Sequence, residues 1–208
     1  MRIGILTFHC AHNYGAMLQC YALQEYLVAQ GHEVSVVDYR PDYLTHGYVR
    51  HALHHWISRN PLRAVKRLLT EPFLYRTRGK RWDGFDRFMR TKLHLTPYHP
   101  ASDYVNFDLI IVGSDQIWSP RLTGEKFDPV FFGKGLACRS VSYAASMSPC
   151  CLSADERKAL PELLRNLDAL SVREAELAEM IRPLTEKEVR VVCDPVLLLT
   201  YEEWERRC

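Results

Sequence analysis

The sequence predicts an α/β fold, because short apolar runs rich in β-branched residues alternate with helical patterns along most of the chain. The first unit shows this alternation most clearly: an apolar strand (Ile3–Phe8) is followed by a helix (Ala16–Ala29). Gly31 stops that helix before a second strand, Glu33–Asp38. Further apolar runs lie at Leu109–Val112, Ser140–Ala144, Ala169–Val172 and Val189–Cys193. The pattern is typical of a Rossmann-like parallel sheet with helices on both faces.

A polar turn joins the first strand to the first helix and is the first candidate ligand site. Asn13 is placed to cap the helix, and Gly15 lets the chain pack closely at the turn. The free N–H groups of a helix start favour phosphate or carboxylate groups. The turn lacks the GxGxxG fingerprint, which argues against dinucleotide binding. His9 and His12 are read either as polar residues of a substrate pocket or as plain loop residues.

Two later helices carry local start and stop signals. Ser153 followed by Glu156 forms a capping-box pattern for a helix over Ala154–Asn166. A second helix is expected over Glu174–Ile181, ending before Pro183. Both helices fit the β–α alternation of the second half of the chain.

Residues from about 41 to 92 depart from the alternation and predict a helical, basic insertion. Between positions 46 and 92 there are twelve Lys or Arg residues against three acidic ones, interleaved with aromatic side chains. Such a segment can dock an anionic glycan, a lipid-linked sugar or a membrane surface as a peripheral contact. The alternative is a solvated insertion whose aromatic residues pack on the core. No nucleic-acid recognition motif accompanies the charge, and the chain as a whole has a net charge of only +2.

The cysteine pattern and the hydropathy favour a cytoplasmic protein. The seven cysteines are odd in number and include no CxxC pair, so they read as reduced thiols. No export-type apolar segment and no run of about 18 apolar residues is present. A zinc site at His9, Cys10, His12 and Cys20 is disfavoured because adjacent His9 and Cys10 cannot easily point at one ion. We expect no metal and no cofactor.

Five segments, in this order, make the chain similar to the polysaccharide pyruvyl transferase family. Each pairs an apolar strand or helix with a polar turn, and together they span nearly the whole chain. They are Asn13-Tyr14-Gly15-Ala16 with Leu18-Gln19 and Tyr21-Ala22-Leu23, Asp108–Trp118, Ser142–Ser146, Leu170–Glu174 and Cys193–Leu198.

The resemblance implies an enzyme that transfers the enolpyruvyl unit of phosphoenolpyruvate to a sugar as a pyruvate ketal. It implies the first half of a glycosyltransferase-B-like two-domain architecture: residues 1–200 as the N-terminal Rossmann-like domain and 201–208 as the start of a connection to a missing second domain. The implied partners are phosphoenolpyruvate, a carbohydrate acceptor that is free or lipid-linked, and a second domain or partner chain over the exposed cleft face. The family's second-half Ser-Phe-His-Gly segment has no counterpart here, so this half alone is expected to be inactive.

Asp115 and Arg173 are the two candidate catalytic residues. Asp115 follows a buried strand and Gly113, which suits a general base or an acceptor of sugar hydroxyl groups; alternatively, it caps a helical turn over Gln116–Trp118. By resemblance, Arg173 matches an arginine of the family's phosphoenolpyruvate site; alternatively, it forms an ion pair with Glu174 or Asp194. Asp194 itself is read as structural. The remaining substrate-binding candidates are Asn13, Tyr14, Gly15, Gln19, Ser114, Gln116 and Glu174.

The strands that end at Phe8, Gly113, Ala145 and Val172 are expected to end on one edge of a single parallel sheet. Because ligands gather at that edge, Asn13, Asp115 and Arg173 should share a site no more than about 20 Å across. Two other functions remain open: a nucleotide-sugar-dependent glycosyltransferase-like enzyme, and a non-catalytic binding module.

Overall fold

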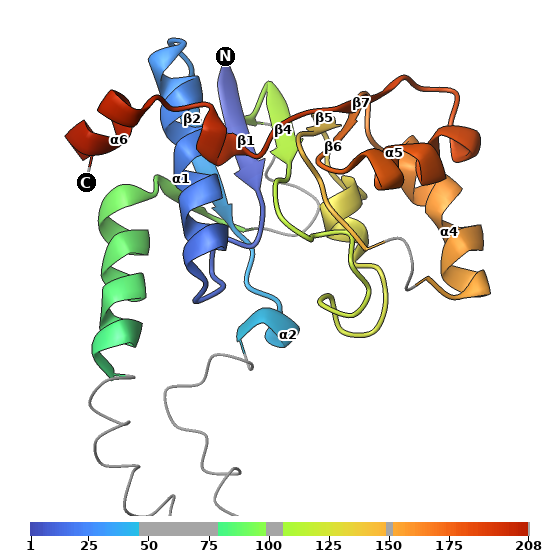
Figure 1. Cartoon of the computed structure of the whole chain (residues 1–208), viewed down its shortest axis with the longest axis horizontal. Helices are drawn as coiled ribbons and strands as arrows, with labels where there is room; N and C mark the ends of the chain where they lie inside the picture. Colours follow the sequence, from blue (N-terminus) through green and yellow to red (C-terminus); the bar gives the residue numbers. More distant parts are fainter. Residues whose placement is uncertain (46–78, 99–105, 149–151, 208) are drawn as a thin grey trace, which may run out of the picture.

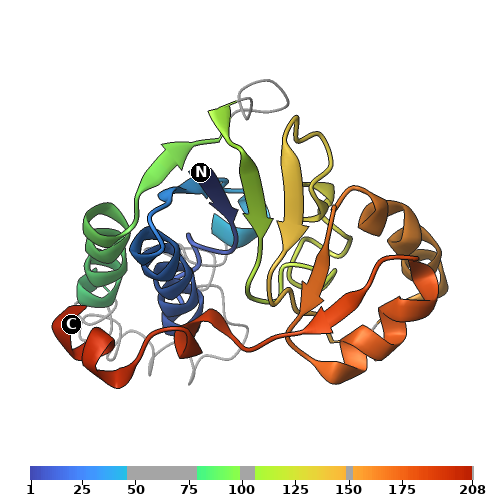
Figure 2. The ribbon, with the colours of Figure 1, turned by 90° about the horizontal axis from the view of Figure 1, so that it is seen from above.

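The centre of the molecule is a five-stranded parallel sheet with strand order β3-β2-β1-β4-β5 (Figures 1 and 2). The computed structural model describes residues 1–45, 79–98, 106–148 and 152–207. The strands are β1 (Arg2–Leu6), β2 (Glu33–Asp38), β3 (Leu95–Pro97), β4 (Leu109–Val112) and β5 (Arg139–Ser142). All four neighbouring pairs are parallel, so the strands end on the same edge. The predicted α/β class with a Rossmann-like parallel sheet is confirmed.

Two further strands continue the sheet without full pairing to it. β6 (Leu170–Val172) and β7 (Val189–Val191) form a parallel two-stranded sheet. Isolated parallel bridges join it to the chain of β5, from Val141 to Ala169 and from Ala145 to Val172. The expected single sheet is therefore five strands plus two, connected by bridges. The carboxyl end of β6 nevertheless lies beside those of β4 and β5 (Figure 2).

Helix α1 (Tyr14–Ala29) begins two residues earlier than expected and confirms the predicted cap. The side chain of Asn13 accepts hydrogen bonds from the backbone N–H groups of Gly15, at 2.8 Å, and Ala16, at 3.4 Å. Gly31 ends the helix with a φ of 82°, a conformation that glycine adopts without strain. The preceding strand is shorter than predicted, because the chain already bends after Leu6.

A helix over residues 79–92 lies beside α1 and confirms the helical character of the described end of the basic insertion (Figures 1 and 2). The Gln24 side chain ties the two helices together. Its Nε2 donates to the Lys92 carbonyl at 2.9 Å, and its Oε1 accepts from the His94 N–H at 2.7 Å. At its start the insertion forms the short α2 (Asp42–Thr45); the expected helices between positions 46 and 78 lie outside the described residues.

The remaining helices follow the second half of the sheet. They are η4 (Pro129–Phe132), α4 (Ala154–Arg165), α5 (Ala175–Ile181), η6 (Arg182–Leu184), η7 (Pro195–Leu197) and α6 (Tyr201–Arg207). The capping box at the start of α4 is confirmed, because Ser153 and Glu156 exchange both hydrogen bonds. The predicted helix over Glu174–Ile181 is also confirmed, because α5 ends at Ile181, before Pro183. The chain continues directly into the 3-10 helix η6, where proline stands near the start and needs no N–H.

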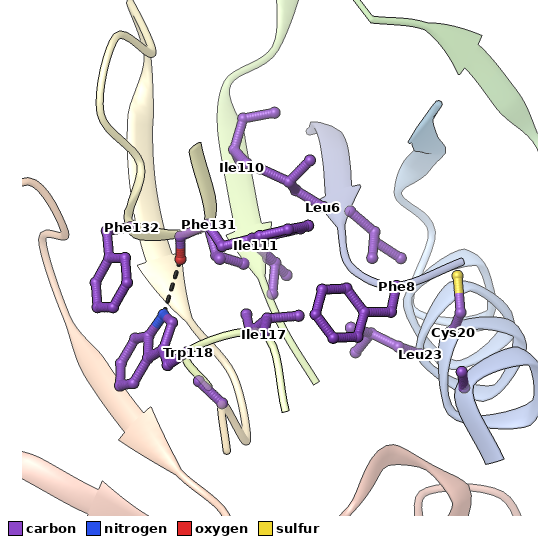
Figure 3. Packing of buried hydrophobic residues seen from close by; sticks show 14 of the residues in the cluster. Leu6, Phe8, Cys20, Leu23, Ile110, Ile111, Ile117, Trp118, Phe131 and Phe132 are labelled. Atoms are coloured by element: carbon purple, nitrogen blue, oxygen red, sulfur yellow. Dashed lines mark hydrogen bonds between the residues drawn. The ribbon is translucent and has the colours of Figure 1, made fainter. Parts of the chain in front are cut away.

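The hydrophobic core extends along both sides of the sheet, and one part of it holds the loop that follows β4 (Figure 3). Trp118 is fully buried there, stacks on Phe132 with ring centroids 5.0 Å apart, and donates from Nε1 to the Phe131 carbonyl at 2.8 Å. Phe8 from the β1–α1 loop meets Phe131 edge-on at 5.2 Å. These contacts hold the loops after β1 and β4 in fixed positions at the carboxyl edge of the sheet.

Helix α6 returns across the first helix of the chain (Figure 1). Arg207 pairs with Glu25 of α1 at 3.1 Å, and its carbonyl accepts from Lys92 at 3.0 Å. The ring of Trp204 lies 6.1 Å from that of Tyr21. The last helix is thus packed on the domain that begins the chain.

Candidate functional site

The loop after β4 is shaped by Gly113. Its φ is 123°, and a Cβ atom there would lie 2.2 Å from the Tyr143 carbonyl oxygen, so only glycine fits. This close approach brings the end of β4 against the chain that continues from β5. Asp115, two residues on, has a φ of 77° and bridges to Ala145. The geometry therefore holds Asp115 at the carboxyl edge of the sheet.

The Asp115 carboxyl group has properties of a proton acceptor. Burial raises its pKa above the ordinary value and the charge of Asp194 adds to this, while the hydrogen bond from the Gln116 N–H and the charge of Arg173 oppose it. Oδ1 accepts from that N–H at 2.7 Å. A raised pKa brings a carboxylate closer to the proton affinity that a general base needs. The chain turns after Asp115, with the Ser119 N–H donating to the Gln116 carbonyl at 3.0 Å. Asp115 accepts from the first N–H of this turn, so the capping interpretation is compatible with a role as a base.

Ser114 and Gln19 belong to a buried hydrogen-bond network beneath the loop. Gln19 Nε2 donates to Thr7 Oγ1 at 3.0 Å and to the Ala16 carbonyl at 2.9 Å, and its Oε1 accepts from the Ser114 N–H at 3.2 Å. Ser114 Oγ donates to the Ala144 carbonyl at 3.0 Å. Both were expected to bind substrate; the structure places them under the site, joining α1 to the loop after β4.

Arg173, directly after β6, is the centre of an ion-pair cluster. Its Nε donates to Glu174 Oε1 at 2.9 Å, one terminal nitrogen to Asp194 Oδ2 at 2.8 Å, and the other to Ser146 Oγ at 3.2 Å. Burial lowers the Arg173 pKa, but the two carboxylates outweigh it and the pKa is raised. The expected ion pairs with Glu174 and Asp194 are both present. These contacts use three of the five N–H donors of the guanidinium group. One N–H donor on each terminal nitrogen is left for a ligand.

The charge around Arg173 is predominantly negative. Three carboxyl groups, those of Asp115, Glu174 and Asp194, interact with one guanidinium. Glu174 Oε2 is buried and accepts no hydrogen bond from the described residues. Asp194 also accepts from the Val196 N–H at 3.1 Å at the start of η7, in keeping with its expected structural role. Such a cluster offers acceptor oxygens to a ligand that brings hydroxyl groups.

Asn13, Tyr14 and Gly15 are exposed at the start of α1. The Asn13 side chain occupies the N–H groups of Gly15 and Ala16, so an anion at this helix start competes with the cap. The Tyr14 ring packs on Phe85, at 4.8 Å between centroids. Gln116 is likewise exposed, next to Asp115.

A second polar cluster, which the sequence interpretation missed, lies at the end of β2. His9 is fully buried, with Nε2 2.7 Å from Asp38 Oδ1 and Nδ1 3.3 Å from the Thr7 carbonyl. Arg40 Nε donates to the same Asp38 oxygen at 2.6 Å. The sequence contains a signal for this cluster, because Asp38 is the last residue of the predicted strand Glu33–Asp38 and so lies at the carboxyl edge of the sheet. His9 is therefore enclosed in the fold, while the His12 ring packs on Trp82 at 4.0 Å and has a pKa lowered chiefly by burial.

Within the described ranges, no group of three His, Cys, Asp or Glu side chains is arranged to hold a metal ion. In the same part of the chain, none of the helices combines the length and the apolar character needed to cross a bilayer.

One of three comparisons with known proteins gives a match, and this match covers nearly the whole chain. The searches of curated proteins and of solved structures returned no match. A family model described as polysaccharide pyruvyl transferase matches residues 13–207. The match includes the start of α1, the loop after β4 and the Arg173 cluster, the same segments that suggested the resemblance. The chain therefore belongs to the polysaccharide pyruvyl transferase family.

Proposed function

We propose that the protein takes part in transferring the enolpyruvyl unit of phosphoenolpyruvate to two hydroxyl groups of a carbohydrate. Both hydroxyl oxygens form bonds to C2 of the enolpyruvyl unit, and the bond from C2 to the phosphate oxygen breaks. One hydroxyl proton ends on the methylene carbon, which becomes a methyl group, and the other leaves with phosphate. The products are a cyclic pyruvate ketal and inorganic phosphate. The family assignment supports this reaction.

The observation that carries the proposal is the position of Asp115 beside Arg173 at the carboxyl edge of the sheet. Asp115 accepts the proton of the attacking hydroxyl, and Glu174 accepts a hydrogen bond from the sugar. Arg173 holds the phosphate or carboxylate of the donor through the two N–H groups that its ion pairs leave over. The chain acts as the N-terminal half of a two-domain, glycosyltransferase-B-like enzyme in the cytoplasm, where phosphoenolpyruvate is the donor and no cofactor is needed.

Ligand-dependent thermal unfolding of the chain tests this proposal. A ligand that binds only the folded state raises the unfolding free energy by about 2.7 kcal/mol at a concentration 100 times its Kd, which corresponds to a Tm increase of roughly 5–10 °C for a chain of this size. We expect phosphoenolpyruvate to raise Tm, and pyruvate with phosphate to do so less. A Tm increase with nucleotide sugars and none with phosphoenolpyruvate would favour the glycosyltransferase-like alternative instead.

A further inference from the structure

An apolar groove of about 300 Å³ runs between α1 and the helix over residues 79–92. One wall is formed by Tyr14, Met17 and Leu18, and the other by Phe85 and Phe88. On each helix these side chains are spaced three or four positions apart, so each helix presents a continuous apolar stripe to the other. The Tyr14 side of the groove begins at the start of α1, next to the loop that carries Asn13.

Gly84 keeps this groove open. It directly precedes Phe85 and lies one turn before Phe88, it is exposed, and a Cβ atom built on it has no heavy atom within 4 Å. The helix conformation does not require glycine there, since Gly84 is not among the glycines with positive φ. Glycine in a helix interior lowers stability by about 1 kcal/mol relative to alanine. A space that the neighbouring side chains leave unfilled, at a cost in helix stability, is the expected form of a ligand groove.

The charge at the groove is concentrated at its Tyr14 end. Lys80 and Arg81 line this end, and the Arg81 guanidinium lies 5.5 Å from the Tyr14 ring centroid and 5.4 Å from that of Phe85. Over the described helix, positions 79–92, five basic residues face two acidic ones. Lys80 is exposed and has no ion-pair partner among the described residues. The groove therefore combines an apolar channel with a cationic entrance, which complements an anionic amphiphile.

We propose that the groove binds the hydrocarbon chain of a single lipid phosphate, with the phosphate at Lys80 and Arg81. The volume is at the lower end of the roughly 300–1,000 Å³ range of ligand pockets, which suits one chain. Met17 and Phe85 are buried in the groove, whereas Tyr14, at 64%, Leu18, at 37%, and Gly84 are exposed. The groove is therefore open to solvent, and a single chain can enter between the two helices and cover the apolar side chains. This inference rests on the proposed function, because it identifies the carbohydrate acceptor as lipid-linked.

Titration of the chain with dodecyl phosphate, below its micelle concentration, tests the groove directly. Trp82 lies on the same helix and provides a fluorescence signal. We expect binding to weaken about fourfold for each methylene removed from the alkyl chain. Dodecyl maltoside, which has the same chain without the charge, and inorganic phosphate, which has no chain, should both bind at least tenfold more weakly.

Gly84→Leu places a side chain in the groove, and Gly84→Ala is the matched control. Leucine and alanine both have a higher helix propensity than glycine, so both variants should fold with a Tm equal to or higher than that of the native chain. We expect Gly84→Leu to weaken dodecyl phosphate binding at least tenfold and Gly84→Ala less than threefold. Lys80→Glu should weaken binding of the phosphate but not of the maltoside.

Equal dodecyl phosphate affinity in Gly84→Leu and the native chain would overturn the groove assignment. So would binding to vesicles of phosphatidylglycerol that is unaffected by Gly84→Leu, since that result indicates a membrane surface. The Tm increase with phosphoenolpyruvate is read separately on the same Gly84→Leu variant, where it should persist. Lipid phosphate binding without any phosphoenolpyruvate effect would leave the groove in place and refute the proposed transfer reaction.

Discussion

Asp115 combines a left-handed backbone with a carboxyl group whose pKa is raised by burial. Two residues earlier Gly113 packs closely on the Tyr143 carbonyl, and a bridge joins Asp115 to Ala145. Burial makes the ionised form of this carboxyl group less stable than the ionised form of a carboxyl group in water. Its higher proton affinity suits a base that accepts a proton during a reaction.

Asp115→Asn should stabilise the fold at neutral pH. An acid whose pKa is raised in the folded state binds its proton more tightly there, so stability rises as the pH falls through that pKa and is lower once the group is ionised. Asparagine has no charge, keeps the oxygen that accepts from Gln116 and tolerates the left-handed region. Urea unfolding at several pH values should show the variant as the more stable protein at pH 7, with the difference closing below about pH 4. A less stable variant at pH 7 would refute the buried-carboxylate interpretation.

Arg173→Lys separates the two roles of the ion-pair cluster. Lysine keeps the charge but cannot bond Glu174, Asp194 and Ser146 together, so we expect a loss of about 1 kcal/mol, or roughly 2–4 °C in Tm. If Arg173 also holds the donor, the Tm increase with phosphoenolpyruvate should disappear. Arg190→Lys is the control: Arg190 pairs with Glu188 at a site where both side chains are 70% exposed, and neither quantity should change. If Arg173→Lys lowers Tm but phosphoenolpyruvate still raises Tm as in the native chain, Arg173 has a structural role only.

At the scale of elements, the site depends on how closely the ends of neighbouring strands approach each other. The last residue of β4 is followed by Gly113, whose missing side chain lets the Tyr143 carbonyl come within contact distance. The same approach allows the bridges from Asp115 to Ala145 and from Ala145 to Val172. Three consecutive strand ends are thereby fixed relative to each other, and Asp115 and Arg173 with them.

Gly113→Ala should be much more destabilising than the same change at a glycine with open space around it. At Gly113 a methyl group meets a carbonyl oxygen and the backbone has a φ of 123°, so we expect a loss of more than about 2 kcal/mol. At Gly135 the φ is 82° but no atom lies within 4 Å of the added Cβ, and Gly135→Ala should cost only the roughly 1 kcal/mol of the left-handed conformation. Urea midpoints of the two variants provide the comparison. Equal losses would mean that the strand ends separate readily.

At the scale of the whole molecule, the end of the chain is packed on its beginning. Trp204 of α6 donates from Nε1 to the Val196 carbonyl at 3.1 Å and lies near Tyr21 of α1, while Arg207 pairs with Glu25. η7 also contacts α1, so the segment from η7 through α6 covers one face of that helix. The helix that begins the candidate site is thus held by residues almost a full chain length away.

Trp204→Ala should detach α6 from α1 and reduce stability by about 2–3 kcal/mol, because the indole is partly buried and its hydrogen bond is lost. Tyr201→Ala on the same helix is the control, since that side chain is 73% exposed. Hydrogen exchange should show faster exchange of α6 amides in Trp204→Ala and unchanged exchange in β4. Uniformly faster exchange across the sheet would mean that α6 unfolds only together with the whole domain.

The sequence by itself determined the features that depend on neighbouring residues. The alternation of apolar and helical patterns predicted the α/β sheet, and the caps at Asn13 and Ser153 each involve residues no more than three positions away. The candidate residues at the strand ends also follow from the sequence, because parallel strands share one carboxyl edge.

Only the tertiary structure decided which side chains meet. The pairs His9–Asp38 and Glu25–Arg207 are separated by 29 and 182 positions, so their contacts depend on strand order and helix packing that no local pattern contains. The three-residue strand β3 escaped prediction because it is too short for a period-two pattern and ends at Pro97. Gln19 and Ser114 share a family-like motif with the exposed site residues, yet the fold buries them, because burial depends on which face of α1 lies against the sheet.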